Sequence, residues 1–258
     1  MSFYYWNPTF TLDSVEGDVL RNNDVHTLYI RYLDVDWTPS DSAPVPLAPF
    51  SYGTSPADYT IIPVVTIRNR VFEKMNPASI PAFAADIYAR VRQINESRRL
   101  QNQEIQFDCN WAPQTRGNYF AFLREYHRIS VESISSAIRM FQLRYAERVG
   151  VPPVDYGVLF YFNLEETDTG NERSIYERAA AHHYTPSLRS YPLTLDVAIP
   201  LFAAARDVRD GEALFEIIAD INRHSNHHIR NLIFFDLNRE NLIRYDRNVF
   251  REALARIN

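Results

Sequence analysis

The stretch IQFDCNW, residues 105–111, has the pattern that decides the fold of this chain. It is rich in apolar and aromatic residues, as buried β-strands are, and polar side chains stand near its carboxyl end. Residues 80–94 before it place apolar side chains at helical spacing behind Ser79, a residue type that caps helices. Residues 119–126 after it show helical spacing again. The chain here therefore predicts a helix, a strand and a helix in succession.

Similar apolar, β-branched or aromatic runs recur about every 30 residues, which is the length of one strand-and-helix unit. The runs lie at residues 3–6, 27–37, 61–69, 105–111, 134–142, 156–164, 193–202 and 231–237. Segments with helical spacing separate them, including residues 214–221 and 250–257. Strands that are apolar on both faces and alternate with helices form parallel sheets, and a set of eight matches a closed barrel. We therefore predict an α/β fold, a single (β/α)8 TIM barrel domain over residues 1–258.

An open doubly wound sheet is the alternative to the barrel. That fold usually has a glycine-rich turn after its first strand, and FYYWNPTF at residues 3–10 contains no glycine. Two segments are ambiguous or unusual within the barrel. Residues 134–148 fit a strand followed by a helix or a helix throughout, and the proline-rich residues 38–56 read as a long loop after the second strand. Loops after barrel strands build the active face, so we expect this loop to wall one side of a groove.

Composition excludes several classes of protein. The 258 residues are 46% hydrophobic, enough for a large core, and a net charge of −5 without a basic block argues against a nucleic-acid partner. No run approaches the roughly 18 apolar residues of a membrane span. The start lacks a signal-peptide pattern, which predicts a cytoplasmic protein unless the sequence is a trimmed mature form. The lone Cys109 excludes an internal disulfide, and the sequence does not indicate an oligomeric state.

The sequence lacks the common cofactor and nucleophile motifs. It contains no GxSxG, Walker, HExxH or GxGxxG pattern, and no glycine lies between Gly170 and Gly211 to line a late phosphate site. Histidines occur at 182–183, 224 and 227–228, after predicted helices, where their charge complements the helix dipole. We therefore expect no cofactor and no metal, and we consider nucleotides, flavins and sugar phosphates unlikely ligands.

Polar and aromatic residues gather near the carboxyl ends of the predicted strands. These residues are Trp6, Asp34, Asp36, Trp37, Arg68, Asn69, Asp108, Asn110, Trp111, Gln142, Asn163 and Asp236. Burying such polar groups is costly unless they are paired or solvated, so a ring of them predicts a wet barrel mouth. Indole faces and carboxylates together suit a sugar, whose rings stack and whose hydroxyls need hydrogen bonds. The alternative is that the aspartates form structural ion pairs with Arg31, Arg68 and Arg139.

Three segments carry a resemblance to a known family. They are QFDCNWAPQTRGNYFAFLREYHR at 106–128, VDW at 35–37 and LIFFDLNRENLIRY at 232–245. Together they resemble a bacterial group of uncharacterised TIM-barrel domains related to glycoside hydrolases. The resemblance implies a carbohydrate ligand at the carboxyl-terminal face of the barrel.

A more distant resemblance, to the chitinase-like glycosidases, bears on catalysis. Those enzymes end their fourth strand with Asp, any residue, Asp, an aromatic residue and a catalytic Glu. Aligned on that pattern, Asp108 matches the first Asp, Asn110 the second, Trp111 the aromatic residue and Ala112 the Glu. The general acid is therefore missing, and either another carboxylate has taken over its role or the barrel binds without cleaving.

We expect a glycoside hydrolase-like protein that acts on or binds a carbohydrate. If it is an enzyme, Asp108 and Asp36 are the favoured catalytic pair, because neighbouring strands would bring their ends together. Other candidates for the second carboxylate are Asp196, Asp236, Glu165, Glu166 and Asp168. The predicted binding residues are Trp6, Asp34, Trp37, Asn110, Trp111, Asn163 and Asp236. The alternative is a non-catalytic barrel that binds a glycan or scaffolds a protein partner.

Overall fold

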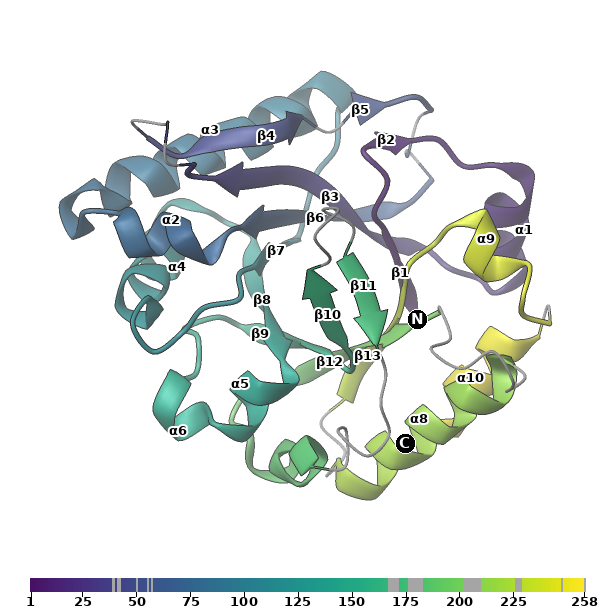
Figure 1. The fold of residues 1–258 in the computed structure, drawn as a ribbon. Helices are drawn as coiled ribbons and strands as arrows, with labels where there is room; N and C mark the ends of the chain where they lie inside the picture. Colours follow the sequence, from purple (N-terminus) through teal and green to yellow (C-terminus); the bar gives the residue numbers. More distant parts are fainter. Residues whose placement is uncertain are drawn as a thin grey trace.

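The computed structural model shows a closed barrel of parallel strands (Figure 1). It describes residues 1–258 except 39, 41–42, 50, 55, 57, 167–171, 176–182, 202–209, 226–228, 247 and 258. The barrel strands are β1 (Ser2–Tyr5), β3 (Thr27–Asp36), β6 (Thr60–Ile67), β7 (Glu104–Asp108), β8 (Ser133–Arg139), β9 (Tyr156–Phe160), β12 (Leu195–Pro200) and β13 (Ile229–Phe235). Each pairs in parallel with its neighbours in sequence order, and β1 pairs with both β13 and β3 to close the ring. The predicted (β/α)8 barrel is confirmed, and each predicted run overlaps one of these strands.

Helices surround the barrel in Figure 1. They are α1 (Ser14–Asn22), α2 (Asn69–Lys74), α3 (Ile80–Arg98), α4 (Arg116–Ile129), α5 (Met140–Arg144), α6 (Ala146–Val149), α8 (Asp210–His224), α9 (Arg239–Leu242) and α10 (Val249–Arg256), with 3-10 turns at Pro77–Ser79 and Thr185–Ser190. The ambiguous residues 134–148 form a strand followed by helices. Ser79 makes no side-chain cap to α3; instead the Asn76 side chain accepts a hydrogen bond from the backbone of Ala78 (3.0 Å).

The proline-rich residues 38–56 differ from the expected loop. Two described parts of this segment are strands: β4 (Val45–Pro49) runs antiparallel to β3, and β5 (Ser51–Tyr52) pairs with β2 (Thr9–Phe10). Proline is tolerated in β4 because this strand has a single described neighbour, so its backbone nitrogens need not serve a second ladder. No helix is described between β3 and β6, and β4 covers that side of the barrel.

Alternation along the strands creates two apolar clusters. The inner cluster fills the barrel and includes Tyr4, Tyr29, Phe160 and Phe235. The outer cluster lies between the barrel and its helices and includes Phe107 and many helix residues. A small hairpin, β10 (Asn163–Glu166) and β11 (Glu172–Ile175), follows β9 and projects over the barrel centre in Figure 1.

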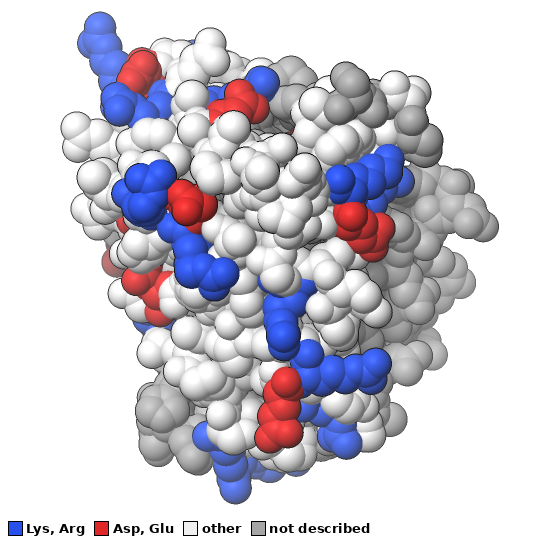
Figure 2. Space-filling view, turned by 90° about the vertical axis from the view of Figure 1, so that its left-hand side faces the viewer, with Lys and Arg blue, Asp and Glu red and all other residues white. Residues whose placement is uncertain are grey.

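The surface carries mixed charge on the side shown in Figure 2. Basic side chains lie there in separate groups, several of them beside acidic ones. None of the described helices combines the length and the apolar character that crossing a membrane requires.

Candidate functional site

The carboxyl ends of the barrel strands bring several predicted residues to one mouth, and arginines pair with three of the aspartates. Arg31 Nε donates to Asp34 Oδ1 (2.7 Å), and a second hydrogen bond joins the same two side chains. Arg70, at the start of α2, pairs with Asp36. Arg139 Nη2, at the end of β8, donates to Asp108 Oδ1 (2.8 Å). The pairs made by Arg31 and Arg139 fit the alternative in which the aspartates form structural ion pairs with arginines. Asp36 also pairs with an arginine, but this arginine is Arg70, which the sequence analysis did not name.

Asp36 and Asp108 do not lie on neighbouring strands. The sheet order places β6 between β3 and β7, so two strand spacings, about 10 Å in all, separate the strands. Asp36 Oδ1 also accepts the backbone N–H of Trp37 (2.7 Å). The hydrogen bond from Arg70 lowers the pKa of Asp36, so this carboxylate holds its charge and is poorly suited to donate a proton.

Aromatic side chains form the floor of the mouth. Trp6 is partly exposed and packs against Phe235, with ring centroids 5.3 Å apart. Phe162 stacks on Phe160 and also contacts Phe235, each pair with centroids 5.3 Å apart. Two of the paired arginines cover this floor: the Arg31 guanidinium lies 5.2 Å from the Trp6 ring and that of Arg139 lies 4.4 Å from Phe160. The floor thus combines flat apolar faces with fixed hydrogen-bond donors.

Trp37, Asn110 and Asn163 lie toward the rim. Trp37 is partly exposed, and Lys74 Nζ donates to its carbonyl oxygen (3.0 Å) while lying 5.9 Å from its ring. Asn110 follows β7 and is exposed. Asn163 opens β10 and pairs with Ile175 of β11; its side chain lies outside the described part of the structure. Three of the predicted binding residues therefore belong to the segments that leave the strand ends.

Trp111 is not at the mouth. Its side chain is 0% exposed and belongs to the outer cluster, where it stacks on Tyr119 with centroids 5.4 Å apart. Its Nε1 donates to the carbonyl oxygen of Val149 (3.0 Å). Because β7 ends at Asp108, strand alternation no longer decides where Trp111 points. The prediction that a sugar stacks on this indole is wrong, because the side chain is fully buried.

Asp236 differs from the other aspartates at this end. Among Asp34, Asp36, Asp108 and Asp236, it alone makes no ion pair with a described arginine. Its Oδ1 accepts hydrogen bonds from Asn238 Nδ2 (2.8 Å) and Asn241 Nδ2 (2.7 Å). Burial raises the pKa of Asp236 above its ordinary value. Of these carboxyl groups it is the one best suited to hold a proton.

This environment predicts that Asp236→Asn stabilises the protein at neutral pH. Asparagine keeps the acceptor oxygen for both amides but avoids burying a charge. Because the folded pKa is raised, the stabilising protonated form is fully present below about pH 4, the unfolded value, and is lost as pH rises through the folded pKa. The gain in unfolding free energy, measured by urea denaturation, should therefore appear at pH 7 and shrink toward pH 4. A variant that is less stable at pH 7 would contradict this account.

The remaining carboxylate and histidine candidates lie elsewhere. Asp196 is the second residue of β12 and therefore sits at the amino-terminal end of the barrel. The side chains of Glu165 and Glu166, and all of Asp168, His182, His227 and His228, lie outside the described residues. His224 ends α8, and its Nδ1 lies 2.9 Å from the carbonyl oxygen of Asp220. In the part of the chain that the structure describes, no three His, Cys, Asp or Glu side chains are grouped as metal ligands.

Sequence reasoning missed Arg70 as the partner of Asp36 and the ion cluster that surrounds Asp196. The position of Arg70 was a usable signal, because a residue three positions past the end of β6 can reach back to the neighbouring strand β3. For the cluster, Glu104 and Arg230 near the start of their strands were a usable signal.

Comparison with known proteins shows a shared fold. No family model and no curated protein matches the sequence. The spore cortex-lytic enzyme SleL of Bacillus cereus has a TM-score of 0.58 at 11% identity, covering 100% of this chain and 74% of that one. The xylanase-alpha-amylase inhibitor protein XAIP-I, in complex with trehalose, has a TM-score of 0.53 at 11% identity, covering 99% and 96%. The class V chitinase of Nicotiana tobaccum, in complex with NAG4, has a TM-score of 0.54 at 8% identity, covering 99% and 97%. At these identities the likeness shows the fold alone, a TIM barrel that this chain shares with two enzymes and an inhibitor protein.

Proposed function

We propose that this protein binds a carbohydrate at the carboxyl-terminal mouth of its barrel and does not cleave it through Asp36 and Asp108. The observation that carries the proposal is the pairing of both aspartates with arginines, Arg70 and Arg139. A glycosidase needs one carboxyl group that donates a proton and a second that acts as a base or nucleophile. Two carboxylates that are each paired with an arginine, on strands separated by β6, do not supply that division of roles.

The same groups are well arranged for binding. Each Asp–Arg pair fixes two polar side chains before a ligand arrives, which lowers the entropic cost of forming hydrogen bonds with sugar hydroxyls. Trp6 supplies a partly exposed indole beside them, and apolar sugar faces pack on such rings. Trp37 and Asn110 at the rim extend the contact along an oligosaccharide.

The structural neighbours support a carbohydrate ligand without deciding between binding and hydrolysis. SleL and the class V chitinase are named as enzymes, whereas XAIP-I is named as an inhibitor protein and was solved with trehalose. The same architecture thus serves enzymes and an inhibitor protein. Whether this protein cleaves a carbohydrate or only binds it therefore depends on the residues at the mouth.

The test is a binding titration with chitin, peptidoglycan, β-glucan and α-glucan oligosaccharides, in which Trp6→Ala is compared with wild type. We expect Trp6→Ala to weaken binding about tenfold, because an aromatic contact contributes roughly 0.5 to 1.5 kcal/mol beyond its buried area. The matched control is Tyr88→Ala, which removes a partly exposed aromatic ring from α3 on the outside of the barrel. That variant should bind as wild type does.

Product release from the same panel separates binding from hydrolysis. Asp108→Asn and wild type should release the same amount of product, because Asp108 takes part in no chemical step under the proposal. Turnover that disappears in Asp108→Asn would overturn the non-catalytic assignment. Turnover that survives Asp108→Asn and disappears in Asp236→Asn would instead place the general acid on the eighth strand, as the raised pKa of Asp236 allows. Absence of binding to every glycan would overturn the proposal as a whole.

A further inference from the structure

A separate pocket lies at the opposite, amino-terminal end of the barrel. Its volume is about 260 Å³, just below the roughly 300 to 1,000 Å³ of typical small-molecule sites. The first residues of β1, β3, β6, β7 and β13 line it, and the lining is polar and apolar in equal parts. Hydroxyl groups come from Ser2, Thr27 and Thr60, and amide groups from Gln103 and Asn231. A space of this size suits one small polar molecule.

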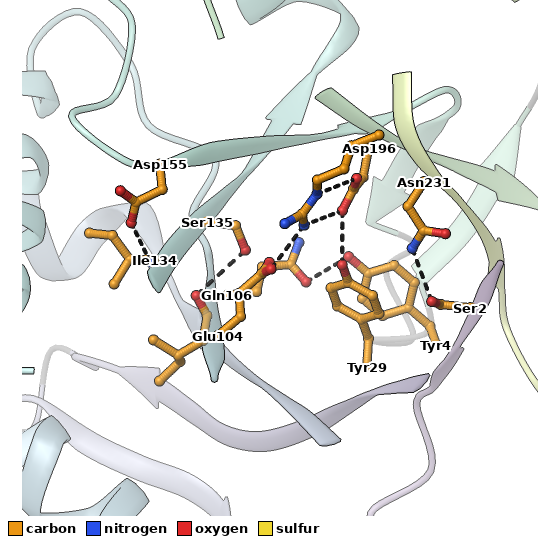
Figure 3. A network of polar contacts seen from close by, with 12 residues as sticks. Ser2, Tyr4, Tyr29, Glu104, Gln106, Ile134, Ser135, Asp155, Asp196 and Asn231 are labelled. Atoms are coloured by element: carbon orange, nitrogen blue, oxygen red, sulfur yellow. Dashed lines mark hydrogen bonds and ion pairs between the residues drawn. The ribbon is translucent and has the colours of Figure 1, made fainter. Parts of the chain in front are cut away.

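The floor of this pocket is an ion cluster. Arg230 holds Asp196 through two hydrogen bonds, Nε to Oδ1 (2.9 Å) and Nη2 to Oδ2 (2.6 Å), and its Nη2 also donates to Glu104 Oε2 (2.9 Å). The Tyr29 hydroxyl donates to Asp196 Oδ2 (3.0 Å), as Figure 3 shows. The Arg230 guanidinium lies 3.7 Å from the ring of Tyr156. Glu104 and Arg230 face the pocket, whereas Asp196 is 0% exposed behind them.

Two polar atoms beside this floor have unused hydrogen-bonding capacity. Glu104 Oε1 and Gln106 Nε2 are buried, and neither has a hydrogen-bond partner among the described residues. Glu104 and Gln106 project from the same face of β7, and Gln106 lies deeper, where the Tyr4 hydroxyl donates to its Oε1 (2.6 Å) (Figure 3). Burial raises the pKa of the Glu104 carboxyl above its ordinary value, and the nearby Ser135 hydroxyl opposes this rise. The hydrogen bond of that hydroxyl runs to the carbonyl oxygen of Ile105 (3.5 Å). The Glu104 carboxylate, which lines the pocket and has no described partner for Oε1, is therefore the acceptor nearest to a ligand bound there.

We propose that this pocket binds a small neutral polyol, of the size of a single monosaccharide or smaller. A hydroxyl group both donates and accepts, so it can donate to the Glu104 carboxylate while its oxygen accepts from a neighbouring N–H. The hydroxyl and amide lining offers the same mixed pairing around the rest of the molecule. A cation would meet Arg230 at the floor, and an anion would meet Glu104 with Asp196 behind it, so charge disfavours both. The site is independent of the carbohydrate mouth, which lies at the other end of the strands.

The test is a titration of the ¹⁵N-labelled protein with glycerol, D-glucose and myo-inositol, followed by the amide signals of Thr60 and Asn231. Methylammonium and acetate serve as charged probes of small size. Thr60→Phe fills the pocket from an exposed strand-end position and keeps the backbone N–H that bonds to His26. Thr27→Phe does the same from the neighbouring strand if the first variant folds poorly. The matched control is Val131→Phe, at a residue that is 93% exposed and outside the lining.

We expect saturable shifts with at least one polyol, a loss of affinity of tenfold or more in the pocket-filling variant, and unchanged affinity in Val131→Phe. Trp6→Ala should leave this titration unchanged, which separates the pocket from the mouth. Shifts by methylammonium or acetate at lower concentration than any polyol would overturn the ligand class. The site itself is refuted if no probe shifts these amides, or if Thr60→Phe and Thr27→Phe bind as wild type does.

Discussion

Trp111→Ala is expected to lower the free energy of unfolding by about 3 to 5 kcal/mol, the usual cost of truncating a buried large aromatic residue. The indole is fully buried, stacks on Tyr119 and lies with its centroid 5.9 Å from that of Phe120. Alanine leaves a cavity between β7 and α4, and it also leaves the Val149 carbonyl oxygen without the Nε1 donor. Urea denaturation followed by far-UV circular dichroism measures this loss.

Two variants separate packing from surface effects in this experiment. Trp111→Phe keeps most of the buried area and loses the indole hydrogen bond, so its loss of stability should be smaller, about 1 to 3 kcal/mol. Trp37→Ala removes a partly exposed indole at the rim and should cost about 1 kcal/mol or less. If Trp111→Ala kept full stability while weakening glycan binding, Trp111 would be a binding residue and not a core residue.

The barrel was predictable because its strands are buried on both faces. Inside, they meet side chains from the opposite wall, and outside they meet helices, so runs such as 158–162 are apolar or aromatic without interruption. Helical spacing then identified α3, α4, α8 and α10. The strand β4 was missed for the opposite reason: its prolines are typical of loops, and only an edge position, which is a tertiary property, makes them acceptable in a sheet.

The site was predictable only in part, because position along a strand is visible in sequence and partners are not. Asp34, Asp36 and Asp108 lie at the carboxyl ends as expected, yet Asp36 pairs with Arg70, 34 residues away along the chain. Trp111 was misplaced because alternation ends where the strand ends. Asp196 was grouped with the mouth candidates although it is only the fourth residue of the predicted run 193–202, a position that already indicated the amino-terminal end of the barrel.

Arg230→Met should destabilise the protein by about 3 to 5 kcal/mol, because it leaves two buried carboxylates without their cation. Asp196 would keep only the Tyr29 hydroxyl as a described partner for Oδ2, and Glu104 would lose the bond to its Oε2. Methionine occupies a similar volume, so the change tests charge more than packing. Arg230→Lys keeps the charge but loses the paired contact with Asp196 and the flat contact with Tyr156, and it should show an intermediate loss.

The matched rescue is the triple variant Glu104→Gln, Asp196→Asn and Arg230→Met, which removes all three charges and keeps their shapes. A buried ion cluster replaced as a unit by neutral side chains often costs little or stabilises, so this variant should recover most of the loss seen in Arg230→Met alone. Urea denaturation of wild type, Arg230→Met and the triple variant at pH 7 measures the three free energies of unfolding. If the triple variant is as unstable as Arg230→Met, the shapes and hydrogen bonds of the cluster hold this end of the barrel together. Recovery would show that the penalty comes from uncompensated charge, so that Arg230 is needed mainly because Asp196 and Glu104 are buried beside it.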